Sequence, residues 1–340
     1  MRILIDAFGG DNSPEEVVIG AIDAVNERAG FDAVLCGDEN KISAILQNLE
    51  YDKSRVSILN ASEVITCEEE PTVAIRRKPD SSICVAFKDL RENPNTKAFV
   101  SAGSTGAVLV GATLKLGRIA GVNRPALCPV MPTINDGKVL LLDAGANADC
   151  KPINLCQFAL MGSIFAKTLG VENPKVALLS NGTEDEKGNA LNHEVFPVLK
   201  QMKEINFVGN CEARDLLSGK YDVIVADGFS GNVAVKSMEG GVVTVMKMMK
   251  GLLKSSLKNK MGALLLKKSL MKFKDKMDYN KTGGAFFIGV NKVVVKAHGS
   301  SDRVAIKAAV LQAESYARSE LTEKIKEGIS SVNINVSETV

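Results

Sequence analysis

The sequence predicts an α/β protein built around a mainly parallel β-sheet with helices on its faces. Short apolar runs rich in Val, Ile and Leu recur along the 340 residues, with helical stretches between them. The runs lack alternating polar residues, which is typical of parallel strands that are covered on both faces. Alternation of strands and helices favours a parallel sheet, because each crossover needs a helix. The predicted strands are 2–6, 33–36, 56–59, 98–101, 139–143, 175–180, 206–208 and 222–227.

The composition is that of an ordinary globular protein. Hydrophobic residues make up 45% and charged residues 24% of the chain, which excludes disordered and fibrous classes. The seven cysteines include no CxxC pair, and His193 and His298 lie far apart. This pattern excludes zinc ribbons and disulfide scaffolds and favours a reducing cytoplasm. We expect no metal, no cofactor, no secretory leader and no membrane-spanning segment.

One segment, at about 240–281, departs from the strand–helix alternation. Ten lysines and one acidic residue between Lys247 and Lys276 give it a net charge of +9 in a protein whose total is +2. Apolar residues and lysines fall on opposite sides of two helical wheels, with a turn predicted at 259–262. We therefore expect one α/β domain over 1–330 with an amphipathic helical hairpin projecting at 240–281, and a C-terminal tail at 331–340.

Four predicted strands end in turns rich in glycine and small polar residues, at 6–11, 101–106, 143–147 and 227–232. In open α/β sheets, ligands bind at the carboxyl ends of the strands. Glycine lets the backbone approach a ligand, and free N–H groups at a helix start bind anions. The candidate phosphate-binding residues in these turns are Asp6, Gly9, Gly10, Ser101, Gly103, Ser104, Thr105, Gly106, Asn147 and Asp227. The chain lacks the GxGxxG and GxxxxGK[ST] signatures of dinucleotide and P-loop binding.

Three further residues are candidates for the chemistry itself. Lys187 lies beside Gly188 just after a predicted strand, where an ammonium can neutralise a phosphate or an oxyanion; the alternative is a solvated acidic loop. Asn232 is a candidate hydrogen-bond donor, and its alternative role is a helix N-cap. His298 is a candidate acid or base, because its ordinary pKa is near 6.5, and its alternative is a structural hydrogen bond.

Seven motifs occur in an order that resembles the bacterial acyl-carrier-protein:phosphate acyltransferase family. They are DAFGGDNSP (6–14), RRKPDSS (76–82), SAGSTGAVL (101–109), LLDAGANADC (141–150), LLSNGTEDEKGN (178–189), ADGFSGNVAVK (226–236) and GGAFFIGV with HGS (283–290 and 298–300). The resemblance covers about residues 1–320. It implies a three-layer α/β/α fold similar to phosphotransacetylase and the isocitrate dehydrogenase group, a homodimer, and peripheral membrane association.

The resemblance also implies an activity: reversible transfer of a fatty acyl group from acyl-acyl-carrier-protein to inorganic phosphate. The acyl phosphate product serves phospholipid (phosphatidic acid) synthesis. The family links the lysine of its KGN motif and the asparagine of its DGFxGN motif to catalysis, which are Lys187 and Asn232 here. Where this family has asparagine, the chain has Ser104, and we expect altered affinity rather than lost chemistry because both side chains donate hydrogen bonds.

The expected location is cytoplasmic and peripherally membrane-associated. The expected partners are acyl carrier protein, a second copy of the chain, an anionic membrane surface and the membrane acyl-phosphate:glycerol-3-phosphate acyltransferase, with no nucleic acid. Candidate contact residues on the hairpin are Leu264, Leu265, Lys267, Lys268 and Lys272. Basic amphipathic helices suit an anionic membrane; docking of the acidic carrier protein and a dimerisation arm are the alternatives.

Two other functions remain open from the sequence. One is an acyl-CoA-dependent phosphate acyltransferase similar to phosphotransacetylase. The other is a non-catalytic protein that binds lipid or nucleic acid through the basic hairpin, which leaves the glycine turns unexplained. A dehydrogenase is disfavoured because its glycine fingerprint is missing.

Overall fold

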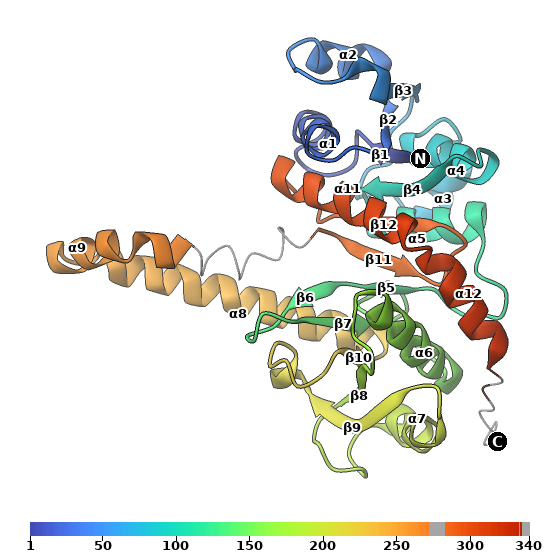
Figure 1. The fold of residues 1–340 in the computed structure, drawn as a ribbon, viewed down its shortest axis with the longest axis vertical. Coiled ribbons are helices and arrows are strands. Elements are labelled where there is room, and N and C mark those ends of the chain that lie inside the picture. Colours follow the sequence, from blue (N-terminus) through green and yellow to red (C-terminus); the bar gives the residue numbers. More distant parts are fainter. Residues whose placement is uncertain (272–282, 333, 335–340) are drawn as a thin grey trace.

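The computed structural model describes residues 1–271, 283–332 and 334. Its strands form two sheets, which lie one beyond the other in Figure 1. Lys272 and the rest of the predicted hairpin up to 281 lie outside the described residues, as does most of the predicted tail at 331–340.

The first sheet has seven strands in the order β3-β2-β1-β4-β12-β11-β5. Its neighbours run parallel except β11, which is antiparallel to both β12 and β5. The strands are β1 (Arg2–Asp6), β2 (Asp32–Gly37), β3 (Val56–Asn60), β4 (Thr96–Ser101), β5 (Ala126–Cys128), β11 (Ala285–Ile288) and β12 (Val293–Lys296).

The second sheet has five strands in the order β6-β7-β10-β8-β9. All neighbours are parallel except the pair β6 and β7. The strands are β6 (Val130–Pro132), β7 (Lys138–Leu142), β8 (Lys175–Ser180), β9 (Asn206–Glu212) and β10 (Val223–Val225).

Helices cover both faces of each sheet. In β1, Ile3 and Ile5 pack into the same cluster as α1 and α11, whereas Leu4 points to the opposite face and packs with α4. The second sheet packs α6 and α7 on one face and the start of α8 on the other. The helices in the body are α1 (Glu15–Glu27), α2 (Glu39–Leu46), α3 (Pro71–Arg77), α4 (Ser82–Glu92), α5 (Thr105–Gly111), α6 (Pro152–Thr168), α7 (Ala190–Gln201), α11 (Arg303–Arg318) and α12 (Leu321–Ser331), with shorter turns η1 (Lys53–Arg55), η2 (Ala112–Leu116) and η3 (Ala213–Asp215). The predicted three-layer α/β/α class is confirmed.

All eight predicted strands are present, and four short ones were missed. Those four, β5, β6, β11 and β12, have three or four residues each, too few for a periodic pattern to separate them from loops. They include the strands at the neighbouring edges of the two sheets, β5 and β6. The sequence therefore gave no sign that the strands divide into two sheets.

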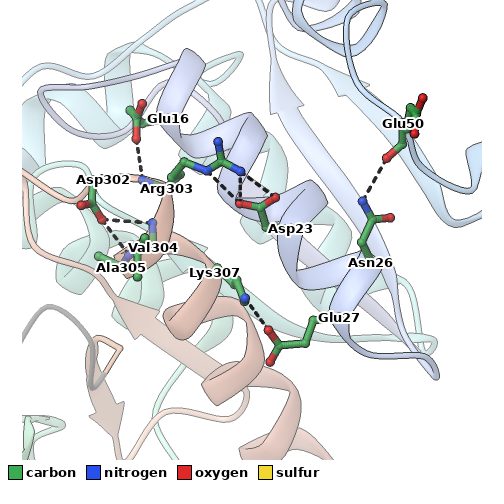
Figure 2. A network of polar contacts seen from close by, with 10 residues as sticks. All are labelled: Glu16, Asp23, Asn26, Glu27, Glu50, Asp302, Arg303, Val304, Ala305 and Lys307. Carbon is green, nitrogen blue, oxygen red and sulfur yellow. Dashed lines mark hydrogen bonds and ion pairs between the residues drawn. The ribbon is translucent and has the colours of Figure 1, made fainter. Parts of the chain in front are cut away.

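Ion pairs join α1 to the start of α11 (Figure 2). Arg303 forms two hydrogen bonds with Asp23, at 2.9 and 3.0 Å, and its backbone N–H donates to the Glu16 carboxylate at 2.6 Å. Lys307 pairs with Glu27 one turn further along. The N-cap of α11 is Asp302, which accepts from two backbone N–H groups. These contacts hold the loop before α11 beside the glycine turn that follows β1.

A helical arm leaves the body from the second sheet (Figure 1). It consists of α8 (Gly228–Lys254), a single helix of 27 residues, followed by α9 (Leu257–Leu265). The predicted turn at 259–262 is wrong, because these residues lie within α9 and the chain reverses at Ser255 and Ser256. The Ser256 side chain accepts from the Asn259 N–H at 3.1 Å and so starts α9 as its N-cap. In the described part of the chain, no helix combines the length and the apolarity needed to cross a bilayer.

Candidate active site between the two sheets

A cavity of about 410 Å³ lies where the two sheets meet, and we call it the cleft cavity. The first sheet contributes β5, the start of β11, the end of β12 and the first residue of α5, and the second contributes β6, the turn after β7 and the first turns of α8. Its lining residues are Thr105, Leu127, Pro129, Val130, Met131, Ala144, Gly145, Asn232, Val235, Lys236, Met238, Glu239, Gly283, Gly284, Ala285, Lys296, Ala297, His298 and Gly299. Charged and apolar groups therefore share one space.

Two predicted glycine turns pack directly against each other beside this cavity. The buried Asp6 carboxylate accepts from the Ser101 hydroxyl at 2.7 Å, and Ser101 Oγ in turn accepts from the Gly103 N–H at 3.0 Å. A Cβ on Gly9 would lie 2.6 Å from both Asp6 Oδ2 and the Gly103 nitrogen. Burial raises the pKa of Asp6 above its ordinary value, although hydrogen bonds oppose the shift. Asp6 and Ser101 thus hold the backbones of the two turns in contact.

The first turn also contacts the loop that carries His298. Gly10 has a φ of 95°, which glycine tolerates and other residues rarely adopt. Asp11 N–H donates to the Gly299 carbonyl at 2.8 Å, and the Asn12 amide donates to the carbonyls of Ser300 and Ser301. The turns after β1 and β4 and the loop after β12 therefore come together, as the order of parallel strands requires.

The turn after β7 is organised by one carboxylate. Asp143 is fully buried and accepts five hydrogen bonds, from the backbone N–H groups of Leu127, Gly145, Ala146 and Asn147 and from the Asn147 amide. Burial raises the pKa of Asp143, and these bonds oppose the shift. Asn147 donates its remaining amide hydrogen to the Pro125 carbonyl at 2.8 Å. Predicted to bind phosphate, Asn147 is thus engaged within the protein.

Helix α8 starts against this turn. An added Cβ on Gly228 or Gly231 would clash with the carbonyl oxygens of Asn147 and Asp143, so the helix backbone approaches as closely as glycine allows. Asp227 is the N-cap and accepts from the Ser230 N–H at 2.8 Å. The alternative role of Asn232 as N-cap is therefore wrong. Asn232 lies one turn inside the helix, beside Gly145, and lines the cleft cavity.

Lys187 lies on the other side of α8. It is exposed, in the loop that follows β8, and does not line the cleft cavity. Its neighbours Gly188 and Asn189 line a second cavity of about 810 Å³, the side cavity, whose wall also includes Phe229, Ser230 and Val233 of α8. The structure therefore brings Asn232 together with His298 and Thr105, and it does not bring Lys187 to the same cavity.

The other predicted residues have local roles in the described structure. Ser104 is the N-cap of α5 and accepts from the Ala107 N–H at 3.4 Å. Gly106 faces Pro71, leaving no space for a side chain. Thr105 lines the cleft cavity. His298 lines it too, and its Nδ1 lies 2.9 Å from the Ser300 hydroxyl.

Sequence reasoning missed three ionisable residues of the cleft cavity, Lys236, Glu239 and Lys296. Burial raises the pKa of Glu239, and the neighbouring His298 and Lys236 oppose that shift. Lys296 ends strand β12 and is buried. A signal was present, because a lysine that ends an apolar run two residues before His298 is unusual for a buried strand.

Five of the seven cysteines are poorly suited to act as nucleophiles. Burial raises the pKa of Cys150 to about 11 and those of Cys156 and Cys211 to about 12, and it raises those of Cys36 and Cys128 well above the ordinary value. Thiols with such pKa values are protonated at neutral pH and are weak nucleophiles. No described group of three or more His, Cys, Asp and Glu side chains is arranged to hold a metal ion.

Solved structures share this architecture. A phosphotransacetylase from Streptococcus pyogenes superposes with a TM-score of 0.60 at 17% identity, covering 94% of this chain and 94% of that one. EutD phosphotransacetylase from Staphylococcus aureus gives 0.59 at 16% identity, covering 93% and 94%. At such identities the likeness shows the fold, and the expected similarity to phosphotransacetylase is confirmed at that level.

Sequence comparisons reach further. The family model described as fatty acid synthesis protein matches residues 1–324. The phosphate acyltransferase of Clostridium novyi is 48% identical over 97% of this chain and 98% of its own length. That of Acetivibrio thermocellus is 47% identical over 96% of each chain. The chain therefore belongs to the fatty acid synthesis protein family, together with these phosphate acyltransferases.

Proposed function

We propose that the chain is an acyltransferase that moves a fatty acyl group from an acyl-carrier-protein thioester to inorganic phosphate, making acyl phosphate for phospholipid synthesis. The observation that carries this proposal is the likeness, over nearly the whole length, to proteins named phosphate acyltransferase. The cleft cavity supports it, because cationic and hydrogen-bonding groups suited to phosphate lie beside apolar side chains suited to an acyl chain.

The reaction needs two reactants to be held together and one developing charge to be stabilised. A phosphate oxygen attacks the thioester carbonyl carbon, the carbonyl oxygen becomes an oxyanion, and the C–S bond then breaks to release the carrier's thiolate, which takes up a proton. Positioning supplies several kcal/mol and one oxyanion donor about 3 kcal/mol. The Asn232 amide is proposed as that donor, since it projects into the cleft cavity from a helix fixed against the body.

Phosphate is proposed to lie against the turns after β1 and β4, which supply Gly9, Gly10 and the segment 101–106. Lys187 remains a proposed catalytic residue from the family resemblance. Lys187 is exposed and lies in the loop at the carboxyl edge of the second sheet. The next residues of the chain, Gly188 and Asn189, line the side cavity. A negatively charged carrier protein that delivers its thioester across this edge would pass within reach of Lys187.

The arm is proposed to hold the protein at an anionic membrane surface, giving a cytoplasmic, peripherally associated enzyme. Leu264 and Leu265 are 71% and 87% exposed, beside Lys267 and Lys268. Exposed leucines next to lysines suit a headgroup region, where the apolar side chains insert and the ammonium groups meet lipid phosphates. A membrane acyl-phosphate:glycerol-3-phosphate acyltransferase would take the product there, and a second copy of the chain is proposed as a homodimer partner.

The activity is tested by offering purified protein orthophosphate with palmitoyl-acyl-carrier-protein, palmitoyl-CoA or acetyl-CoA, and trapping acyl phosphate with hydroxylamine. Because hydroxylamine also attacks thioesters, only the hydroxamate that depends on both protein and orthophosphate is counted. We expect hydroxamate from the carrier-bound substrate at a higher kcat/KM than from either CoA ester. Preference for a CoA ester would favour the phosphotransacetylase-like alternative. Absence of hydroxamate from all three substrates would overturn the proposal.

A further inference from the structure

Lys296 is a buried cation at the wall of the cleft cavity. It is the last residue of β12, paired in register with Ser101 of β4, and is 8% exposed. Its ammonium donates to the backbone carbonyls of Ala102, at 3.2 Å, and Ala297. An ammonium has three N–H donors. Two are therefore used within the protein, and the third is left for the cavity that Lys296 lines.

This ammonium has no ion-pair partner in the described part of the chain. Cys67, Asp6 and Asp11 act on it through space, but the Asp6 carboxylate is bound to Ser101 and the Phe8 N–H. Burial is the largest effect and lowers the pKa of Lys296 to about 8. Proteins bury a charge at a considerable free-energy cost and normally pair it. An unpaired buried ammonium facing a cavity indicates that its counterion arrives as a ligand.

The surroundings identify the chemistry of that ligand. Ala102, whose carbonyl holds the ammonium, lies in the same turn as Gly103 and Thr105, and Thr105 also lines the cavity. On the opposite wall, Asn232 offers an amide. A ligand here would bond to the Lys296 ammonium and the Thr105 hydroxyl and still have an oxygen facing Asn232. Phosphate has enough acceptor oxygens for this arrangement, whereas a carboxylate or a halide does not.

We propose that Lys296 is the residue that binds the phosphate acceptor, holding one phosphate oxygen with its third N–H while the turn after β4 and Asn232 face the others. The proposal rests on the proposed function and adds a residue to it. Lys187, in the loop on the far side of α8, then serves the acyl donor or its leaving group rather than the resting phosphate.

The test is a comparison of Lys296→Met with Lys292→Met. Lys292 lies just before the first residue of the same strand, outside the lining of the cleft cavity. Its variant therefore removes an equal charge at the end of β12 that is away from the cavity. We expect Lys296→Met to raise the phosphate KM about 10- to 100-fold, the loss of one charge-assisted hydrogen bond. The KM for acyl-acyl-carrier-protein should stay within about twofold, and Lys292→Met should leave both constants near the wild-type values.

Phosphate binding is measured separately, by the rise in Tm that orthophosphate causes, so that the site is tested even without turnover. Wild-type protein and Lys292→Met should be stabilised by phosphate, and Lys296→Met should not. If Lys296→Met fails to fold, Lys296→Gln keeps hydrogen-bond donors while it removes the charge, and the same two readouts apply. An unchanged phosphate KM and Tm response in the variants would overturn the assignment, and so would equal rises in both KM values. Wild-type protein that binds phosphate through Lys296 but makes no acyl phosphate would contradict the proposed function instead.

Discussion

The inner and outer ends of helix α8 differ in what surrounds them. At the inner end, Gly228 and Gly231 lie in backbone contact with the turn after β7, and Asn232 lines the cleft cavity. At the outer end, Val245, Met248 and Leu252 are 61%, 70% and 65% exposed. The inner end of the helix packs closely against the body because glycines there have no side chains. The outer end leaves large apolar side chains exposed to solvent. The body and the arm should therefore respond independently to mutation.

The largest expected effect concerns the chemistry of the inner end. Asn232→Ala should lower kcat about 10²- to 10³-fold, as the removal of one oxyanion donor does, with vesicle binding and Tm unchanged. Ser237→Ala, on the side of α8 that faces the side cavity, is the matched control and should stay within about twofold. An Asn232→Ala enzyme that turns over at the wild-type rate would remove Asn232 from the mechanism.

Two glycines of the same helix should respond with opposite signs. Gly231→Ala forces a Cβ against the Asp143 carbonyl, and we expect it to lower the free energy of unfolding by about 2–4 kcal/mol. Gly240→Ala meets nothing within 4 Å and should raise it by about 0.5–1 kcal/mol, because alanine favours a helix. Urea unfolding measures both, and equal effects would show that the two ends are not distinct.

The outer end should lose lipid contact without loss of chemistry. Lys267→Glu with Lys268→Glu should weaken binding to anionic vesicles by at least about 30-fold, since each lost lysine contributes about 1 kcal/mol and each added carboxylate is repelled. The loss should shrink at high salt. Leu264→Ala with Leu265→Ala should weaken it at every salt concentration. Flotation with anionic and neutral vesicles measures this, and kcat on soluble substrate should not change. Wild-type flotation of both variants would argue for the carrier protein or a second copy as the partner of the arm.

The smallest effect is a pH dependence of stability in the body. The folded pKa of Lys296, about 8, lies below its ordinary value of 10.5, so the buried charge is destabilising below pH 8. This penalty falls as pH rises from 8 toward 10.5. Between pH 7 and 9, wild-type protein should gain about 1 kcal/mol relative to Lys296→Met, measured by urea unfolding in both. The titratable groups around the ammonium are Asp6, Asp11, Cys67, Lys236, Glu239 and His298. If the stability difference between wild-type protein and Lys296→Met stays constant from pH 7 to 9, the lowered pKa of Lys296 is contradicted.

The sequence predicted those parts of the fold that depend on long apolar runs. Strands such as β1 and β8 agree with their predicted bounds, because an uninterrupted apolar run with at least three consecutive buried residues forms the centre of each. The short strand β5 could not be predicted, since it pairs with β11, which is distant in sequence, and β6, although it pairs with the nearby β7, has only three residues. The reversal of the arm was misplaced because Gly262 suggested a turn, whereas the Ser256 side chain sets the start of α9.

The parts of the candidate site that could be predicted are those in which a glycine-rich turn directly follows a predicted strand. The turns at Gly9 and Gly103 meet because they follow adjacent parallel strands. The alternation of strands and helices predicts that both turns lie at the same edge of the sheet, and the structure adds that the two strands are neighbours. The separation of Lys187 from Asn232 could not be predicted. It arises because the Asn232 side chain lies on one face of α8 and the loop that carries Lys187 lies beside the other face. Lys296 was missed because β12 itself was not predicted, so this lysine was not placed at a strand end beside the glycine turns.

Helix α8 runs unbroken from Asn232 to Lys254, roughly 33 Å at 1.5 Å per residue. If the contact of Gly231 with the Asp143 carbonyl is taken as the pivot of a rigid rod, the Asn232 backbone lies about 1.5 Å from it along the axis. If the far end swings by roughly 5 Å, the rod turns by roughly 9°, and Asn232 moves by only about 0.2 Å because it lies so near the pivot. A movement at the outer end of α8 therefore displaces Asn232 very little. Attachment of the arm can change where the enzyme works without changing its rate.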